Sequence, residues 1–429
     1  EYIITKILAL SFLNNKKIIS IEFPRDSEVL EIEPDAFSNS SLKKISFPPK
    51  IEKLIGWADS ASNVSYVSIS PENKNFKTIN HQLIISKSSP KSDTYDTILF
   101  ISRNSTNITI PSYIKYIKSC SFSYTKKLQK IEFSEDSELL KIEKDAFTIS
   151  SIQMINIPSK VEELEDGWCN FTSKLIKILI SPKNKNFSYL DSEMKIVLGK
   201  SDLSLNYFDT IIFGSRDIEQ LSIPKYIKKI YSGSFSKCLN LNELEISEDS
   251  ELEIIGSNSF SKTQIPYLYI PSHVRIIGDG AFSECIFLDE IEFAENSELE
   301  LIKDYAFTRS NSLYSIKIPS HVKKIGHSAF SECEFLEKVI FCENSEIESF
   351  LSNSFSYINI EYILIPKSLK IISEYAFYHC SSLRTIEFQE NSQLELIDDF
   401  AFAYTKLERI KIPKHVKKIG KNAFYFIDN

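Results

Sequence analysis

Glycine is scarce in this sequence, with only 10 among 429 residues. A glycine-rich phosphate loop is therefore not expected, because such loops need closely spaced glycines to bring backbone N–H groups to a phosphate. The formal net charge is -8, so the broad basic surface typical of nucleic-acid-binding proteins is also missing. No apolar run approaches the roughly 20 residues of a transmembrane helix. We expect no nucleic-acid partner and no membrane insertion by this segment.

Cysteine is limited to seven residues, an odd number that gives no disulfide framework. The sequence also lacks a His-Glu-x-x-His, a paired Cys-x-x-Cys and a Gly-x-Ser-x-Gly pattern, so we expect no enzyme activity, catalytic residue, metal or cofactor. Four cysteines lie three residues after a recurring phenylalanine. If repeats stack about 4.8 Å apart, cysteines two repeats apart cannot share a disulfide or a metal ion. We interpret these four as buried core residues: Cys238, Cys285, Cys333 and Cys380.

Apolar and aromatic residues, by contrast, are plentiful and regularly spaced. The chain is 42% hydrophobic and 12% aromatic, which is ample for a packed interior. One phrase, from Ile318 to Phe330, recurs in variants along the whole sequence. From Phe235 onward its closing phenylalanine recurs in steps of 25, 22, 25, 23, 25, 22, 25 and 22 residues, so two repeat lengths alternate. A period in the low twenties is typical of one coil of a leucine-rich solenoid, and about 15 closing aromatics predict about 15 coils: Phe12, Phe37, Trp57, Phe122, Phe147, Trp168, Phe235, Phe260, Phe282, Phe307, Phe330, Phe355, Phe377, Phe402 and Phe424.

Each repeat predicts a short strand, a turn and a return segment. It opens with Leu-x-x-Ile-x-Ile, as in residues 313–318, and apolar residues two apart suit a strand with one buried face. A proline ends the strand in the short repeats, whereas the longer repeats have an acidic turn such as Asn296-Ser297-Glu298. The segment from Val322 to Phe330 has apolar residues three and four apart, which predicts an irregular turn followed by a short helical or 3₁₀ piece.

Two insertions, near residues 76–105 and 187–217, interrupt this rhythm 111 residues apart. Each contains an Asn-Lys-Asn-Phe motif and two strand-like runs joined by a polar linker, which predicts a β-hairpin at the solenoid edge. The repeat phase never resets, so we expect one continuous solenoid over residues 1–429. Neither end carries the polar cap that solenoids need for solubility, which predicts a fragment of a longer chain.

The repeated motif resembles that of a known family. Residues Ile318 to Leu336 follow Ile-Pro-x-x-Val-x-x-Ile-x-x-x-Ala-Phe-x-x-Cys-x-x-Leu almost throughout, and Ile270 to Leu288 nearly as well. This pattern resembles the BspA-type, or Treponema-pallidum-type, leucine-rich repeat. The Asn-Lys-Asn-Phe insertions and Asp-Ser-Glu-Leu turns are similar to those of BspA-like surface proteins of trichomonad parasites. The resemblance implies an α/β fold: a right-handed solenoid with a parallel β-sheet on its concave face, short helical or 3₁₀ turns on the other, and two β-hairpin insertions.

The resemblance also implies a function, which the residues by themselves do not indicate. The family is associated with surface display, adhesion to host cells or matrix, and co-aggregation with microbes. No catalytic residues are known to be shared by its members. We therefore expect a non-enzymatic, cell-surface or secreted protein that binds a protein partner on a host or microbial surface or in the matrix. Many members lack an evident signal sequence, so a cytoplasmic scaffold of the same fold is the alternative.

A row of charges alternates in sign along the C-terminal coils. A single exposed ion pair contributes only about 0–1 kcal/mol, but a slip of one coil would stack like charges, so we expect the row to set the coil register. Composition bias from a duplicated repeat pair is the alternative. The row, one residue from each of nine successive coils, consists of Lys228, Glu253, Arg275, Glu300, Lys323, Glu348, Lys370, Glu395 and Lys417.

The outward positions of the predicted strands supply the candidate binding residues. In most coils these positions are polar, as expected for a solvated strand face. Exposed aliphatic and aromatic clusters often mark interfaces instead. The alternatives are a dimer contact, contact with another part of a longer chain, and drift. The candidate partner-binding residues are Ile340, Tyr362 and Leu364, with a second cluster of Tyr267 and Tyr269.

Overall fold

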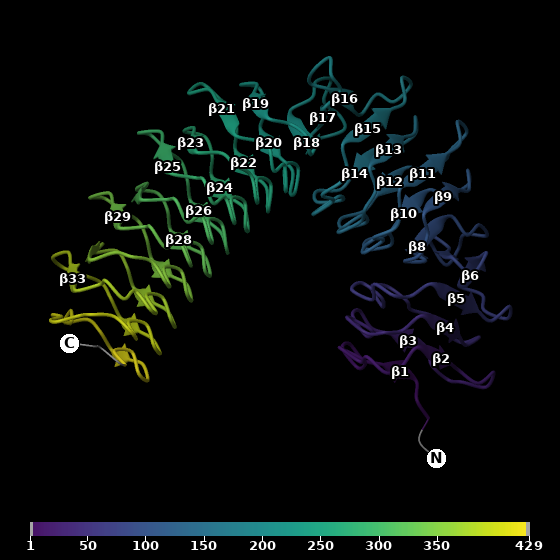
Figure 1. Ribbon diagram of the computed structural model, residues 1–429, viewed down its shortest axis with the longest axis horizontal. Helices are drawn as coiled ribbons and strands as arrows, with labels where there is room; N and C mark the ends of the chain where they lie inside the picture. The colour runs from purple at the N-terminus through teal and green to yellow at the C-terminus, as the bar shows by residue number, and fades with distance from the viewer. Residues whose placement is uncertain (1–2, 426–429) are drawn as a thin grey trace. The chain divides into compact units, whose positions relative to one another are not determined.

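The computed structural model describes residues 3–425. The chain divides into two compact units, residues 1–205 and 206–429, and each is a stack of similar coils built from strands and turns (Figure 1). Together the coils make about 18 turns of parallel β-solenoid, more than the expected 15. That the solenoid continues unbroken between the two units stays a prediction.

Each regular coil contains one long strand, usually of four residues, and one short strand of two residues. Side chains alternate along the long strand, so its second and fourth residues point into the coil and its first and third point out. In unit 1 the long strands are β2 (Ser20–Glu22), β4 (Lys44–Phe47), β5 (Tyr66–Ile69), β9 (Asn107–Ile110), β11 (Lys130–Phe133), β13 (Met154–Ile157) and β15 (Lys177–Ile180). Its short strands are β1 (Lys6–Ile7), β3 (Glu31–Ile32), β10 (Tyr116–Ile117), β12 (Lys141–Ile142) and β14 (Glu163–Leu164).

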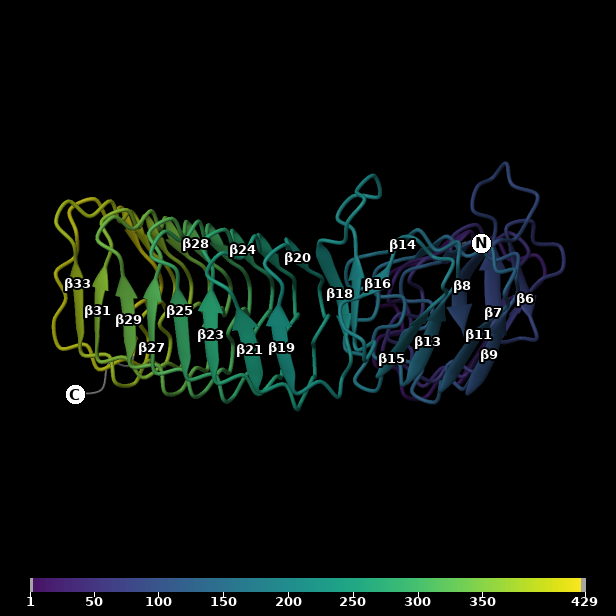
Figure 2. The ribbon, with the colours of Figure 1, turned by 90° about the horizontal axis from the view of Figure 1, so that it is seen from above.

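Unit 2 begins with β18 (Thr210–Gly214) and repeats the same plan. Figure 2 shows its long strands side by side: β19 (Gln220–Ile223), β21 (Glu243–Ile246), β23 (Tyr267–Ile270), β25 (Glu290–Phe293), β27 (Ser315–Ile318), β29 (Lys338–Phe341), β31 (Tyr362–Ile365) and β33 (Thr385–Phe388). Its short strands are β20 (Lys229–Ile230), β22 (Ile254–Ile255), β24 (Ile276–Ile277), β26 (Leu301–Ile302), β28 (Lys324–Ile325), β30 (Ser349–Phe350), β32 (Ile371–Ile372), β34 (Leu396–Ile397) and β35 (Lys418–Ile419).

The two kinds of strand in unit 2 pair differently. The short strands form an unbroken parallel ladder from β18 through β35. The long strands pair only two at a time, as β19–β21, β23–β25, β27–β29 and β31–β33. Figure 1 shows the long strands along the outer, convex edge of the arc of this unit. The expectation of a parallel sheet on the concave face is therefore wrong for the long strands of unit 2.

The corners that carry the closing phenylalanine are chains of turns. No residue from 3 to 425 is helical, so the expected helical or 3₁₀ pieces are wrong, and no helix of the described chain could cross a membrane. In the corner around Phe330, Ser328 and Glu332 have φ angles of 51° and 59°. A right-handed helix cannot contain left-handed residues at that spacing.

This alternating backbone directs N–H groups along the solenoid axis. The amides of Ser328, Phe330 and Glu332 donate to carbonyls of the next coil at 3.0, 2.9 and 2.9 Å. An inter-coil ladder therefore replaces the hydrogen bonds that a helix would have made within one coil. Apolar residues three and four apart in the sequence are typical of a helix. In these corners the spacing reflects only which side chains face the interior.

The core of unit 2 is a column of stacked rings. Its closing phenylalanines are separated by 5.2 to 5.5 Å between ring centroids, with interplanar angles of 4° to 10°. Because phenylalanine occupies the same position in each of these coils, neighbouring rings stack with nearly the same offset throughout. Burial of each ring contributes about 2–3 kcal/mol to the stability of the fold. The column fixes the coil spacing of this unit.

The two tryptophan coils of unit 1 change this arrangement. In regular corners the residue two before the closing phenylalanine has a positive φ, and in these coils that position is taken by Gly56 (φ 67°) and Gly167 (φ 84°). Ala58 and Cys169 therefore stand where phenylalanine is expected, and Trp57 and Trp168 stand one residue earlier. A large and a small side chain have exchanged places, which keeps the core filled. Trp57 packs edge-on against Phe37 at 6.0 Å.

The first insertion is a set of antiparallel strands, as expected. Strands β6 (Phe76–Ile79), β7 (Leu83–Ser86) and β8 (Thr97–Ile101) pair in that order, with a bulge between Ile84 and Ile85. In the second insertion, β16 (Ser188–Tyr189) is antiparallel to β17 (Ile196–Gly199). The Asn-Lys-Asn-Phe motif holds the first insertion in place, because the buried Asn73 amide donates to the carbonyls of Pro49 and Ile51, both at 2.9 Å.

The coil containing β8 has no phenylalanine corner, and an arginine takes its place. The guanidinium of Arg103 is buried over the Phe100 ring, 4.6 Å from its centroid. It donates to the carbonyls of Ser121 at 3.0 Å and Ala58 at 3.1 Å, in the coils on either side. Both carbonyls also accept a backbone N–H, from Ile101 and Ala61 respectively, so the guanidinium adds side-chain hydrogen bonds that link three coils. In unit 2, Arg216 similarly donates to the carbonyl of Ser234 at 2.6 Å.

Candidate interaction surface

The outward residues of the long strands of unit 2 form a continuous surface, which we call the outer strand face. It consists of the first and third residue of each strand from β21 to β33. From Glu243 to Glu387 these residues are Glu243, Glu245, Tyr267, Tyr269, Glu290, Glu292, Ser315, Lys317, Lys338, Ile340, Tyr362, Leu364, Thr385 and Glu387. All are exposed except Tyr269, which is half-buried.

The structure places the first candidate cluster where the strand ladder is interrupted. Ile340 on β29 is 50% exposed, and on β31 Tyr362 is 46% and Leu364 39% exposed. Because β29 pairs with β27 and β31 with β33, no strand pairing joins β29 to β31. A groove of about 490 Å³ lies there, lined by Glu337, Lys338, Val339, Ile340, Phe341, Glu361, Tyr362 and Leu364. We call this the β29–β31 groove.

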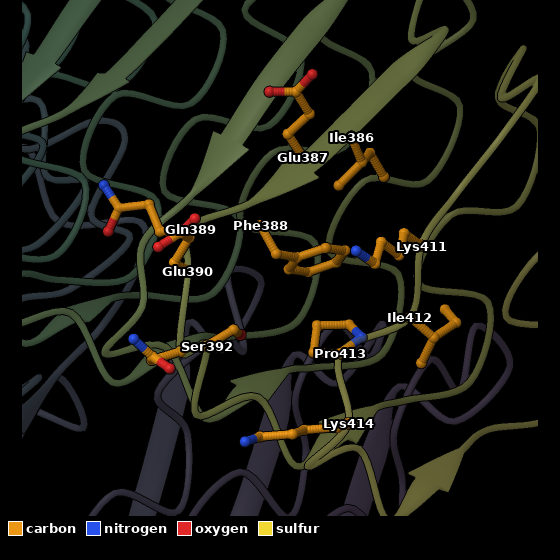
Figure 3. A pocket seen from close by; sticks show the side chains of 11 residues that line it. Ile386, Glu387, Phe388, Gln389, Glu390, Ser392, Lys411, Ile412, Pro413 and Lys414 are labelled. Atoms are coloured by element: carbon orange, nitrogen blue, oxygen red, sulfur yellow. The ribbon is translucent and has the colours of Figure 1, made fainter.

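A groove of similar size recurs two coils further on. It lies between β33 and the segment 411–414, has a volume of about 490 Å³, and is drawn in Figure 3. The Phe388 ring lies beside Lys411, Ile412 and Pro413 in that view, with Glu390 at the edge. Phe388 and Phe341 occupy the last position of their strands, where both are half-buried. The two grooves thus lie about two coils apart, each beside the last residue of a long strand.

The second cluster lies on β23, between two strands that carry glutamates. Tyr267 is paired in register with Glu290, and Tyr269 with Glu292. The Tyr267 hydroxyl donates to Glu292 Oε2 at 2.5 Å, and this hydrogen bond to a carboxylate raises the pKa of Tyr267 to about 12. In the first cluster, the Tyr362 hydroxyl donates to Glu387 Oε2 at 2.9 Å. Both phenols are therefore oriented by a glutamate of the next strand.

The structure also places the nine residues of the charge row side by side. Each one's backbone N–H donates to the carbonyl of the preceding member at 2.8 to 3.0 Å, from Glu253 to Lys417. Ion pairs form between Glu300 and Lys323 at 3.1 Å, Glu348 and Lys370 at 3.2 Å, and Glu395 and Lys417 at 2.9 Å. Arg275 instead pairs at 3.0 Å with Glu298, which lies outside the row. Three bases of the row, Lys323, Lys370 and Lys417, thus contact the acid before them, whereas Arg275 does not. Its proposed part in setting the register stays a prediction.

The cysteines of the regular corners are buried and hydrogen-bonded. Cys285, Cys333 and Cys380 each donate from Sγ to the carbonyl of a phenylalanine in the preceding coil, at 3.1 Å in each case. Burial raises the pKa of Cys285 to about 11 and of Cys333 and Cys380 to about 12, which makes them poor nucleophiles. Within residues 3–425, no three His, Cys, Asp or Glu side chains are grouped to hold a metal ion.

A further aromatic cluster, at the corners of the last coils, was not predicted. Tyr357, His379 and Tyr404 each lie two residues after a closing phenylalanine, and their rings stack with centroids 5.0 and 4.3 Å apart. Tyr375, Tyr378, Phe400 and Tyr425 extend the cluster. The sequence did contain a signal, because the same position in the five preceding coils carries a charged residue: Lys237, Lys262, Glu284, Arg309 and Glu332.

These observations define a class of protein: a parallel β-solenoid with leucine-rich-repeat coils. The chain also matches the profile of the family described as BspA type leucine rich repeat region, over residues 3–91, 94–194, 206–311 and 300–429. Because these matches cover nearly the whole sequence, the chain belongs to the BspA-type leucine-rich repeat family, as the repeated motif predicted. The matching family is a repeat region, and it indicates no enzyme class.

The chain is also similar to several solved structures. A leucine-rich repeat protein from Eubacterium ventriosum is 18% identical, with a TM-score of 0.52 over 86% of this chain and 85% of its own. A leucine-rich cell surface protein from Faecalibacterium prausnitzii is 20% identical, with a TM-score of 0.47 over 90% of this chain and 83% of its own. The pneumococcal vaccine antigen PcpA is 18% identical, with a TM-score of 0.42 over 96% and 78%. A search of curated proteins gave no significant match.

Proposed function

We propose that this protein is a non-enzymatic, adhesin-like interaction protein displayed at the cell surface or secreted, and that the β29–β31 groove is its main contact with a protein partner. The family supports the general role, because stacked repeats present a long surface on which residues can vary without disturbing the core. The observation that carries the proposal is the groove itself. Ile340, Tyr362 and Leu364 are large, exposed and grouped around a recess, as interface anchors are.

The experiment that tests this proposal compares two double variants for binding to cells and to matrix proteins. Replacement of Tyr362 by Ala together with Leu364 by Ser should weaken binding at least tenfold, because truncating two interface anchors costs about 1–2 kcal/mol each. The control is Ile286→Ser with Phe287→Ala, which removes two residues that are each 50% exposed but lie outside the outer strand face. Equal binding by the two variants would refute the assignment.

The location is tested separately, by labelling intact cells with a membrane-impermeant biotin reagent. A surface protein is labelled before lysis, whereas a cytoplasmic scaffold of the same fold is labelled only afterwards. The narrower likeness to trichomonad surface proteins stays a prediction from the sequence, as do host, microbial or matrix proteins as partners.

A further inference from the structure

The outer strand face changes character along unit 2, and its first part is acidic and aromatic. On β21, β23 and β25 the outward residues are four glutamates and two tyrosines: Glu243, Glu245, Tyr267, Tyr269, Glu290 and Glu292. We call this group the Tyr–Glu strip. No lysine or arginine occupies an outward position on these three strands, and none of the four glutamates forms an ion pair with any residue from 3 to 425. Adjacent unpaired carboxylates repel one another and favour a cationic partner.

The tyrosines strengthen this preference for a cation. The face of a tyrosine ring attracts an ammonium or guanidinium group, and a nearby carboxylate adds its own attraction for the same positive charge. The protein already uses this contact on its long strands and directly before them, since Tyr314 precedes β27. Lys338 Nζ lies 5.4 Å from the Tyr314 ring centroid, and Lys44 Nζ lies 6.0 Å from that of Tyr66, on the strand paired with its own. Tyr267 and Tyr269 have glutamates beside them and no lysine on the outward positions of the neighbouring strands.

The strip and the β29–β31 groove are close enough for one short segment to reach both. From β23 to β29 the chain advances three coils, and the core phenylalanines of these coils are 5.3 to 5.5 Å apart at each step. An extended peptide advances about 3.3 Å per residue, so roughly five residues span this distance. The two outward positions of β27 between them, Ser315 and Lys317, are exposed.

From this arrangement we propose the chemistry of the partner. It is a protein segment with a cluster of lysine or arginine residues, which contacts the Tyr–Glu strip, and a large apolar side chain about five residues away, which enters the β29–β31 groove. This inference rests on the proposed function, because it takes the groove as the apolar half of the same binding surface. It adds the sign of the partner's charge and the spacing of its two contacts.

The test uses three fluorescent 12-residue peptides and fluorescence anisotropy with the whole chain. One peptide has four lysines, a serine spacer and a Leu-Phe anchor. The second has glutamates in place of the lysines, and the third keeps the lysines but has serines in place of the anchor. The lysine-anchor peptide should bind at least tenfold more tightly than the glutamate-anchor peptide, and its affinity should fall as NaCl is raised from 50 to 300 mM.

Two pairs of substitutions separate this inference from the proposed function. Glu290→Gln with Glu292→Gln should weaken binding of the lysine-anchor peptide at least threefold and reduce its salt dependence. Glu334→Gln with Glu374→Gln, at exposed positions outside the strip, should leave both unchanged. Ile340→Ser with Leu364→Ser should weaken both anchor peptides but not the peptide without an anchor.

The outcomes are distinguishable. If the lysine- and glutamate-anchor peptides bind equally, or the Glu290 and Glu292 variant behaves like its control, the cationic partner is refuted while the groove can still serve as an interface. If the groove variant leaves both anchor peptides and cell binding unchanged, the proposed function itself fails.

Discussion

At the scale of single residues, the most informative side chains of unit 1 are buried polar groups near the first insertion. The Arg103 guanidinium hydrogen-bonds to the coils on either side, and burial lowers its pKa to about 10, so it remains charged at neutral pH. Asp59 lies in the neighbouring corner. Burial raises the pKa of its carboxyl to about 7, and the charge of Asp35 adds to the shift, although Cys120 and Arg103 oppose it.

The raised pKa of Asp59 predicts a pH dependence of stability. Between about pH 4, where an unfolded aspartate titrates, and about pH 7, the folded state holds a proton that the unfolded chain has released. The contribution of Asp59 to stability is therefore fully present below about pH 4 and is lost as the pH rises through 7. Asp59→Asn should remove this dependence and gain stability relative to the wild type as the pH rises.

Urea unfolding followed by tryptophan fluorescence from pH 4.5 to 8 measures this effect, because both tryptophans, Trp57 and Trp168, lie in the same unit as Asp59. The control is Asp26→Asn, which changes an exposed aspartate. If the difference in midpoint between wild type and Asp59→Asn stays constant over this range, the carboxyl does not titrate near neutrality.

At the scale of one coil, the structure links the alternating charges to the pairing of repeats. Each long coil supplies a glutamate and the following short coil a lysine, so three pairs in unit 2 join the coils of one double repeat. All of these side chains are largely exposed, and each pair by itself contributes at most about 1 kcal/mol. The row can nevertheless influence register, because a slip of one coil would replace every attraction with a repulsion.

Glu300→Lys tests this role. It places a lysine between Arg275 and Lys323, so we expect a melting temperature about 2–4 °C lower than that of Glu334→Lys, which reverses an exposed charge outside the row. Differential scanning calorimetry of the two variants provides the comparison. Equal melting temperatures would mean that the alternation is a by-product of repeat duplication.

At the scale of the whole molecule, the repeat pattern predicts one continuous solenoid, although the chain divides into two compact units. A continuous solenoid couples neighbouring coils through shared core and hydrogen bonds, so its stability is a sum of coil terms and interfaces between coils. If the coupling extends past residue 205, both units should unfold together.

Tryptophan fluorescence can test this continuity, because Trp57 and Trp168 report on residues 1–205 alone. Far-UV circular dichroism, in contrast, reports on the strands of both units. We expect the two signals to show the same urea midpoint within about 0.2 M, as coincident probes do for one cooperative transition. Separate midpoints would show that the two units fold independently.

The sequence by itself determined the interior of this protein. The closing phenylalanines, the Leu-x-x-Ile-x-Ile strands and the two repeat lengths predicted the coils, because burial of apolar side chains at fixed spacing leaves few alternatives. The pattern also predicted that Ile340, Tyr362 and Leu364 would be exposed, since strand residues alternate between two faces.

Only the tertiary structure decided the backbone conformation at the corners and the places where neighbouring long strands do not pair. Left-handed residues such as Ser328 and Glu332 exclude helices at the corners, because their N–H groups bond to the next coil rather than within their own. Strands β29 and β31 do not pair, and a groove lies between them. Both features depend on how a long coil stacks against a short one. Arg103 and Asp59 became significant only when the insertion brought distant corners together. Such contacts depend on neighbours far apart in sequence, so a local pattern does not contain them.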